Sequence, residues 1–174
     1  MGTPLPTSLR NLALGDLDHE LGRTRRTLER VPDEHLGWQP HEKSWPLGTL
    51  AAHIANLPRW SGRILERDEF DLATIAPPDP SQRPGSRDDL LRGFDAAVAD
   101  LRAGLDAADD HALSARWTLR QGERVVMTIP RAAAIRTICI SHMIHHRGQL
   151  TVYLRQVGAA VPALYGPSAD ETGF

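Results

Sequence analysis

The sequence predicts an all-α protein, a four-helix bundle with a small β-hairpin before the last helix. Four segments repeat apolar residues at steps of three and four positions, which is the period of a helix with one buried face. One stretch between the third and fourth of these segments alternates apolar and polar residues instead, which indicates paired strands. The 174 residues are enough for one compact domain, residues 1–174, with its own core.

The first helix is predicted over about residues 7–31 and ends before Pro32, because proline cannot continue the hydrogen-bond ladder. Ser8 or Thr7 is expected to cap its start. Its apolar stripe consists of Leu14, Leu17, Leu21, Leu28 and Val31.

The second helix is predicted to begin at Ser44, its expected N-cap, and to run to about Ile64. Pro58 lies inside this stretch and lacks a backbone N–H, so we expect a kink or a short break there. The inward-facing residues of this helix are Leu50, His53, Leu57, Trp60 and Ile64.

The second half of the chain is predicted to hold a loop, two helices and the hairpin. Residues 67–85 contain four prolines and are expected to form the loop. The third helix starts after Ser86, its expected cap. The hairpin is predicted over residues 117–129 around a glycine-containing turn. The fourth helix is predicted over residues 130–157, with the next residue, a glycine, as its terminator.

The charge balance and the single cysteine exclude several kinds of partner and site. The chain carries 20 basic and 22 acidic residues, a net charge of -2, whereas nucleic-acid-binding domains usually have a basic excess. Cys139 is the only cysteine, so an intramolecular disulfide and a cysteine-based zinc site are excluded. No apolar run approaches the roughly 18 residues of a membrane span, and no signal peptide is recognisable. We therefore expect a cytoplasmic protein without nucleic-acid or membrane partners.

The fourth predicted helix carries two histidines four residues apart, His142 and His146. With about 100° between successive residues, both fall near the middle of an apolar face that also contains Ile135 and Tyr153. An unpartnered imidazole buried there costs on the order of 1–3 kcal/mol, whereas one metal ion satisfies two nitrogens at this spacing. For this pair alone, a structural role in the core and a metal site remain equal alternatives.

His53 shifts the balance toward metal, because it also points inward, from the second helix. Three neutral histidine ligands leave a coordination position open, which is the pattern of a catalytic ion rather than a structural one. We therefore predict that one divalent metal ion is bound by His53, His142 and His146.

Three neighbours of the histidine pair have other expected roles. His145 lies on the flank of the predicted face and is a candidate base, a dimer contact or a plain surface residue. Cys139 is expected to be a small buried hydrophobe rather than a reactive thiol. Arg147 is expected to project away from the apolar face, toward solvent or an interface.

Three segments resemble the DinB-like family of damage-inducible metalloproteins: residues 145–150 (HHRGQL), residues 50–54 (LAAHI) and residues 161–168 (VPALYGPS). The similarity extends over about residues 12–168. It implies an up-down-down-up four-helix bundle, often dimeric, that holds zinc, nickel or another divalent ion. The ligands that the resemblance carries over to this chain are His53, His142 and His146.

Two classes of function follow from the resemblance and the predicted metal site. One is a bacterial-type metal-dependent enzyme that acts on a small molecule. It would be a homodimeric S-transferase dependent on a low-molecular-weight thiol such as bacillithiol or mycothiol, or alternatively a metal-dependent hydrolase. The other is a non-catalytic metal-binding stress-response protein, in which the ion mainly stabilises the bundle.

Overall fold

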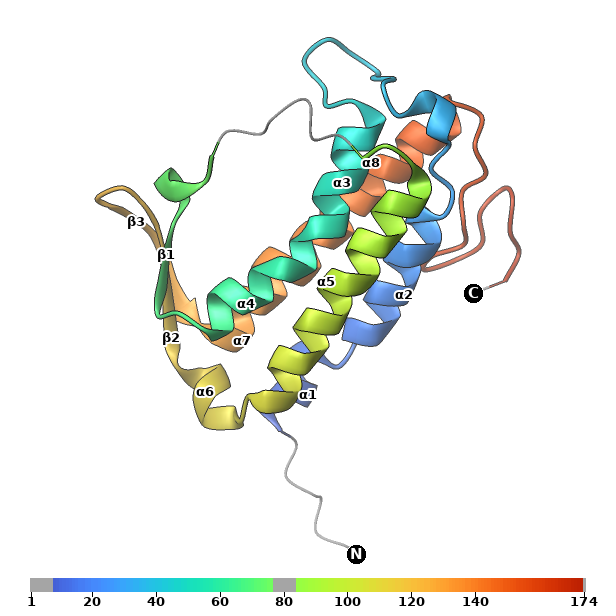
Figure 1. The fold of residues 1–174 in the computed structure, drawn as a ribbon. Coiled ribbons are helices and arrows are strands. Elements are labelled where there is room, and N and C mark those ends of the chain that lie inside the picture. Colours follow the sequence, from blue (N-terminus) through green and yellow to red (C-terminus); the bar gives the residue numbers. More distant parts are fainter. Residues whose placement is uncertain (1–7, 77–83, 174) are drawn as a thin grey trace, which may run out of the picture.

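The computed structural model describes residues 8–76 and 84–173 and is mostly helical (Figure 1). Four helices lie side by side, and each packs against two of the others around a shared apolar core. These helices are α2 (Leu17–Leu28), α3 (Leu47–Asn56), α5 (Arg87–Ala107) and α8 (His142–Gln156). As predicted, Ser86 caps α5, because its side chain accepts a hydrogen bond from the backbone N–H of Asp89.

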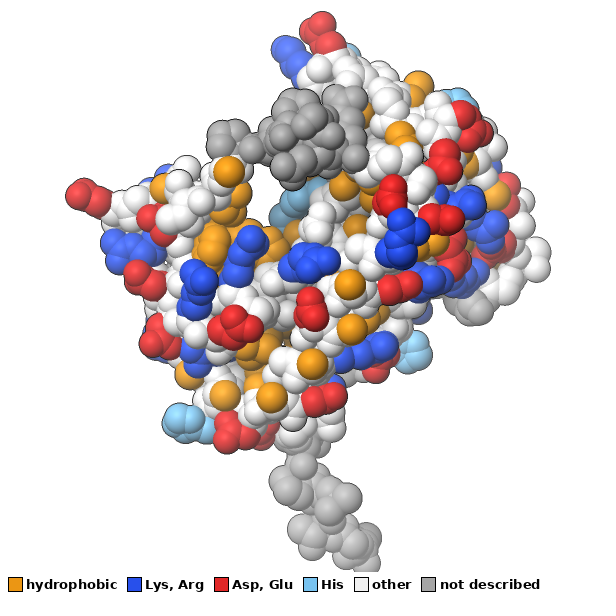
Figure 2. Space-filling view, in the orientation of Figure 1, with side chains coloured by type: hydrophobic (Ala, Val, Ile, Leu, Met, Phe, Trp, Pro, Cys, Tyr) orange, Lys and Arg blue, Asp and Glu red, His pale blue; other side chains and the backbone are white. Residues whose placement is uncertain are grey.

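Charged side chains of both signs are interspersed over the face of the molecule that Figure 2 shows. None of the described helices combines the length and the apolar character needed to cross a lipid bilayer.

The predicted first helix is two helices, so the prediction of one continuous helix over residues 7–31 is wrong. α1 (Leu9–Leu14) ends at Gly15, and α2 begins after Asp16 and ends at Leu28. Asp16 lies at the break with a non-helical backbone, and its carboxylate pairs with Arg136 from a distant segment. Ser8 caps α1 as predicted, whereas Thr7 lies outside the described residues.

Pro58 interrupts the second predicted helix, as expected. α3 ends at Asn56, a 3₁₀ turn covers Leu57–Arg59, and α4 (Trp60–Leu65) follows. The hydroxyl of Ser61 donates to the carbonyl oxygen of Pro58 over 2.8 Å, which satisfies one backbone acceptor near the break.

The start of the second predicted helix was placed too early. Ser44 does not cap it, because α3 begins at Leu47 after Pro46. A backbone hydrogen bond, not a side-chain cap, connects the first turn of α3 to the preceding loop. The N–H of Gly48 donates to the carbonyl oxygen of Leu36 over 2.9 Å. A side-chain carbon at Gly48 would lie only 3.0 Å from that oxygen, so this approach favours glycine.

The predicted hairpin is confirmed, and it belongs to a three-stranded sheet. β2 (Arg116–Gln121) pairs antiparallel with β3 (Arg124–Pro130) through a two-residue turn in which Gly122 has a φ of 61°. β1 (Glu69–Asp71) pairs parallel with β2. The prediction of a loop over residues 67–85 is therefore wrong for β1, which is too short to show a period in the sequence. Residues 77–83 of that range lie outside the described part of the chain.

The fourth predicted helix is continuous but not uniform. α7 (Arg131–Ala134) leads into a π-helical segment, Ile135–Ser141, and α8 follows. A short helix absent from the prediction, α6 (Asp110–Ser114), precedes the sheet. Because a π-helix bonds residue i to residue i+5, it holds more residues per turn than an α-helix. The buried face therefore does not follow a constant step of 100° through this region.

Arg147 is buried, so the prediction that it projects toward solvent or an interface is wrong. It is 1% exposed, and Glu20 on α2 is 2% exposed. Arg147 Nη2 donates to Glu20 Oε2 over 2.6 Å, and its Nη1 donates to the Glu20 carbonyl oxygen over 3.0 Å. The hydroxyl of Tyr165, from the C-terminal segment, donates to the same carboxylate oxygen over 2.7 Å. An arginine is rarely buried without such partners. Because Glu20 lies 127 residues before Arg147, the local sequence around Arg147 does not reveal this pairing.

The carboxylate of Glu20 stays charged despite its burial. Burial raises its pKa, but hydrogen bonds from Tyr165 and Arg147, the charge of Arg147 and a hydrogen bond from Arg23 bring the pKa below its ordinary value. The charged pair therefore persists at neutral pH and joins α2, α8 and the C-terminal segment.

Arg147→Met should lower the free energy of unfolding by about 3–5 kcal/mol, because it leaves a buried carboxylate without its partner. Chemical denaturation followed by circular dichroism measures this difference. Arg102→Met is the matched control: Arg102 pairs with Asp18 in solvent, so its loss should cost at most about 1 kcal/mol. The double variant Glu20→Gln/Arg147→Met should regain part of the loss, and no regain would contradict this account.

Candidate metal centre

The imidazoles of His53, His142 and His146 converge between α3 and α8. His53 Nε2 lies 3.4 Å from His142 Nε2, which lies 2.8 Å from His146 Nε2. One ligand nitrogen from each ring lies within 4.8 Å of the others. Since Zn–N bonds are about 2.0–2.1 Å long, the nitrogen ligands of one tetrahedral zinc ion lie roughly 3.3 Å apart. The spacing of the three nitrogens therefore suits a single ion.

The protonation states of His53 and His142 also suit binding of a divalent cation. Burial, reinforced by His146 and His142, lowers the pKa of His53 to about 4. Burial also lowers the pKa of His142, with smaller contributions from His146 and His145. His53 and His142 are therefore neutral at neutral pH, and neutral imidazole is the form that ligates a metal.

The three histidines lie at the edge of the buried face, not at its centre as predicted. Each is half-buried. The residues that point from α8 into the core are Met143, Arg147, Leu150 and Leu154. Because the imidazoles are not fully buried, the energetic cost of burying them no longer supports the metal site, as it did in the argument from the sequence. The convergence of three ring nitrogens supports it, and partial exposure leaves the cluster accessible to a ligand.

Gln149 orients one of the three rings. Its Oε1 lies 2.7 Å from His146 Nδ1 and accepts a hydrogen bond from it if that nitrogen carries the proton. The lone pair of His146 is then on Nε2, the nitrogen that faces His142. Metal-ligating histidines usually donate their other ring nitrogen in this way, which sets the tautomer and the ring orientation. The sequence analysis did not identify Gln149 as a partner of His146. Its position three residues later on the same helix indicates that the two side chains can meet.

Trp45 forms a wall of the histidine cluster. Its ring stacks on His146 with centroids 5.8 Å apart, and it meets the ring of His53 edge-on at 5.1 Å. Trp45 lies in the loop before α3 and is partly exposed. Beside it is a pocket of about 430 Å³ that includes His146 and Gln149 in its lining. A volume of this order accommodates a small organic molecule.

The two remaining candidates lie outside the cluster. His145 is exposed, and its Nε2 lies 3.3 Å from Gln149 Nε2. Cys139 is buried as predicted, and burial raises the pKa of its thiol to about 12. A thiol in that environment stays protonated and is neither a nucleophile nor a ligand at neutral pH.

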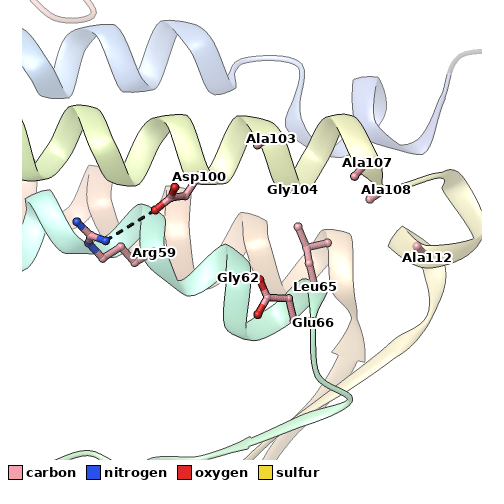
Figure 3. A pocket seen from close by; sticks show the side chains of 10 residues that line it. All are labelled: Arg59, Gly62, Leu65, Glu66, Asp100, Ala103, Gly104, Ala107, Ala108 and Ala112. Atoms are coloured by element: carbon pink, nitrogen blue, oxygen red, sulfur yellow. Dashed lines mark ion pairs between the residues drawn. The ribbon is translucent and has the colours of Figure 1, made fainter.

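A second cavity is separate from the histidines. It has a volume of about 640 Å³ and lies between α4 and α5 (Figure 3). Arg59 and Asp100 form an ion pair at 3.8 Å on its wall. Alanine and glycine residues supply much of the remaining lining, and Glu66 is the one further charged residue among those described there.

Comparisons with known proteins place the chain in a family. Residues 11–172 match the model of the DinB family. YrdA of Bacillus subtilis (strain 168), an uncharacterized protein, is 28% identical over 155 residues, which cover 88% of this chain and 86% of YrdA.

Several solved structures share the fold. A DinB-like protein from Bacillus cereus ATCC 10987 has a TM-score of 0.68 at 23% identity, over 92% of this chain and 100% of its own. YfiT from Bacillus subtilis, described as a probable metal-dependent hydrolase with an unusual four-helix bundle topology, has a TM-score of 0.65 at 14% identity, over 92% and 94%. The mycothiol-dependent maleylpyruvate isomerase has a TM-score of 0.54 at 16% identity, over 93% and 68%. Since the family model spans nearly the whole sequence, this chain belongs to the DinB family.

Proposed function

We propose that this protein is a metal-dependent enzyme that acts on a small molecule, with one divalent ion bound by His53, His142 and His146. The observation that carries the proposal is the approach of three ring nitrogens from two helices to within 4.8 Å of one another. Imidazole ligands suit zinc and nickel among the divalent ions. Three protein ligands leave a coordination position open, as catalytic sites require.

The bound ion would supply Lewis-acid chemistry, lowering the pKa of a water or thiol that reaches the open position. The chain's own residues would prepare that position. Gln149 orients the ring of His146, and Trp45 covers one side of the cluster. His145 has its ring centroid 4.9 Å from that of His146, and we assign it the role of base for an incoming group.

A thiol-dependent S-transferase is the reaction class that we favour. The dependence of a structural neighbour on mycothiol supports a low-molecular-weight thiol as cosubstrate. The pocket beside His146 supplies room for such a molecule. Hydrolysis is the second candidate, supported by the description of YfiT as a probable metal-dependent hydrolase. We further propose that residues 1–174 form one domain with up-down-down-up topology and that the protein works as a homodimer.

The protein purified without a histidine tag should contain about one equivalent of divalent metal per chain. His146→Ala should lose most of it, because two imidazoles bind a divalent ion far more weakly than three. Elemental analysis after dialysis measures the content, and circular dichroism checks that the variant is folded. His19→Ala, on the exposed face of α2, is the control and should keep its metal. Equal metal contents in the two variants would disprove the assignment.

The metal-loaded protein should catalyse conjugation of a low-molecular-weight thiol to an electrophile such as 1-chloro-2,4-dinitrobenzene. His146→Ala should abolish turnover, and His145→Ala should reduce it at unchanged metal content by about 10²-fold or more, the typical contribution of a general base. Absorbance of the conjugate reports the rate. Ester hydrolysis without thiol turnover would favour the hydrolase, and a loaded protein inactive in both assays would favour the non-catalytic stress-response alternative.

Gln149→Leu should weaken metal affinity about 10- to 100-fold, because His146 loses the acceptor that orients its ring. Competition with a chromogenic chelator measures the affinity. Gln149→Glu keeps an acceptor at the same position and should retain affinity close to that of the unaltered protein. If Gln149→Leu binds metal as tightly as Gln149→Glu, Gln149 has no role in positioning the ligand.

A further inference from the structure

The pocket beside the histidine cluster has two walls of different chemistry. The loop before α3 supplies one wall with Lys43 and Trp45, and α8 supplies the other with His146, Gln149 and Tyr153. Because His146 and Gln149 belong to the lining, the pocket borders the proposed metal centre. A molecule that occupies the pocket therefore lies against the ring of His146 and the side chain of Gln149.

The body of the pocket is apolar and aromatic. Leu50 contributes a buried aliphatic side chain. The ring of Tyr153 is braced by Trp38, which meets it edge-on with centroids 5.6 Å apart. Trp45 adds a second aromatic ring on the loop side. Flat or aliphatic groups bury apolar area against such surfaces, which contributes to affinity without selecting for charge.

One side chain gives the pocket its charge. Lys43 is the only lysine in the sequence. Among the described residues that line the pocket, it is the only lysine or arginine, and none is an aspartate or glutamate. Its side chain is exposed, so its ammonium group can move to meet a ligand. The fixed charge of the lining is therefore positive, and an anionic ligand meets no acidic side chain there.

We propose that the pocket selects small molecules that carry a carboxylate, with Lys43 as the residue that determines this specificity. The inference rests on the proposed metal function and adds the substrate class. In a bound molecule, the carboxylate pairs with the Lys43 ammonium, the apolar part packs on Trp45 and Tyr153, and the donor group reaches the ion beside His146. The ligand class is a carboxylate-bearing thiol or a carboxylate-bearing electrophile of similar size.

Two thiols of similar size test the inference with the Co(II)-loaded protein. Mercaptosuccinate carries two carboxylates, and 1-thioglycerol carries none. Binding of either thiolate to Co(II) gives a charge-transfer absorption band, so titration yields a Kd without requiring turnover. The quantity compared is the ratio of the two Kd values within each variant, which cancels changes in the metal centre that affect both thiols.

Lys43→Gln should shift this ratio against mercaptosuccinate by about five-fold, the upper range for a solvent-exposed ion pair. Lys43→Glu should shift it further, and added salt should diminish the preference of the unaltered protein. Lys43→Arg should preserve the ratio because it keeps the charge. Arg59→Gln, which removes a cation from the separate cavity beside α5, should preserve it as well.

The possible outcomes distinguish a failure of the carboxylate specificity from a failure of the proposed metal function on which it rests. A protein that takes up no Co(II) overturns both the metal function and the substrate class. A protein that binds Co(II) and both thiols, with the same ratio in Lys43→Gln as in the unaltered chain, overturns the carboxylate specificity alone. An equal shift in Arg59→Gln would assign the effect to the net charge of the protein and would also overturn the role of Lys43.

Discussion

The buried ion pair between Arg147 and Glu20, together with the buried side chains of Met143, Leu150 and Leu154, holds one face of α8 against the core. Because Arg147 points into the core, the preceding residue on the helix is turned about 100° away, to the edge of the core. That residue is His146, and at this edge its Nε2 lies 2.8 Å from His142 Nε2. If the arginine faced solvent, as the sequence suggested, His146 would leave the position where it meets the histidine from α3. A contact that stabilises the fold therefore also positions a proposed metal ligand.

Partial burial gives the histidine cluster both of the properties that a reactive metal site needs. Burial lowers the pKa of His53 and His142, so that both rings are neutral and able to ligate a cation. Partial exposure leaves room for a further ligand in the pocket that Trp45 and His146 help to line. The π-helical segment that ends at Ser141 lies immediately before His142, the first proposed ligand on α8, and such irregular turns are frequent at functional sites.

Single residues in the sequence predicted the helix break, the cap of α5 and the hairpin turn, because each of these features depends on the chemistry of neighbouring residues. Pro58 breaks the predicted second helix, because a proline in the interior of a helix has no backbone N–H to donate and its ring clashes with the preceding turn. Ser86 caps α5, and Gly122 accepts the positive φ of the hairpin turn. The short strand β1 gave no comparable signal, and the break at Asp16 was marked only by Gly15 and Asp16 themselves, a glycine followed by a capping residue. Asp16 is paired with Arg136, 120 residues away, and β1 exists because β2 offers it hydrogen bonds.

The sequence by itself determined the helical class, the hairpin and the identity of the three histidines, because helical period, turn chemistry and residue spacing act over a few positions. Only the tertiary structure decided which face of α8 is buried. That choice depends on Glu20, which lies 127 residues from Arg147 along the chain and compensates its charge inside the core. The hydroxyl of Tyr165 adds hydrogen bonds to both side chains. The tertiary structure also decided that His146 lies at an accessible edge beside Trp45 and Lys43. The loop before α3 and helix α8 come from separate parts of the chain and meet there only in the folded protein.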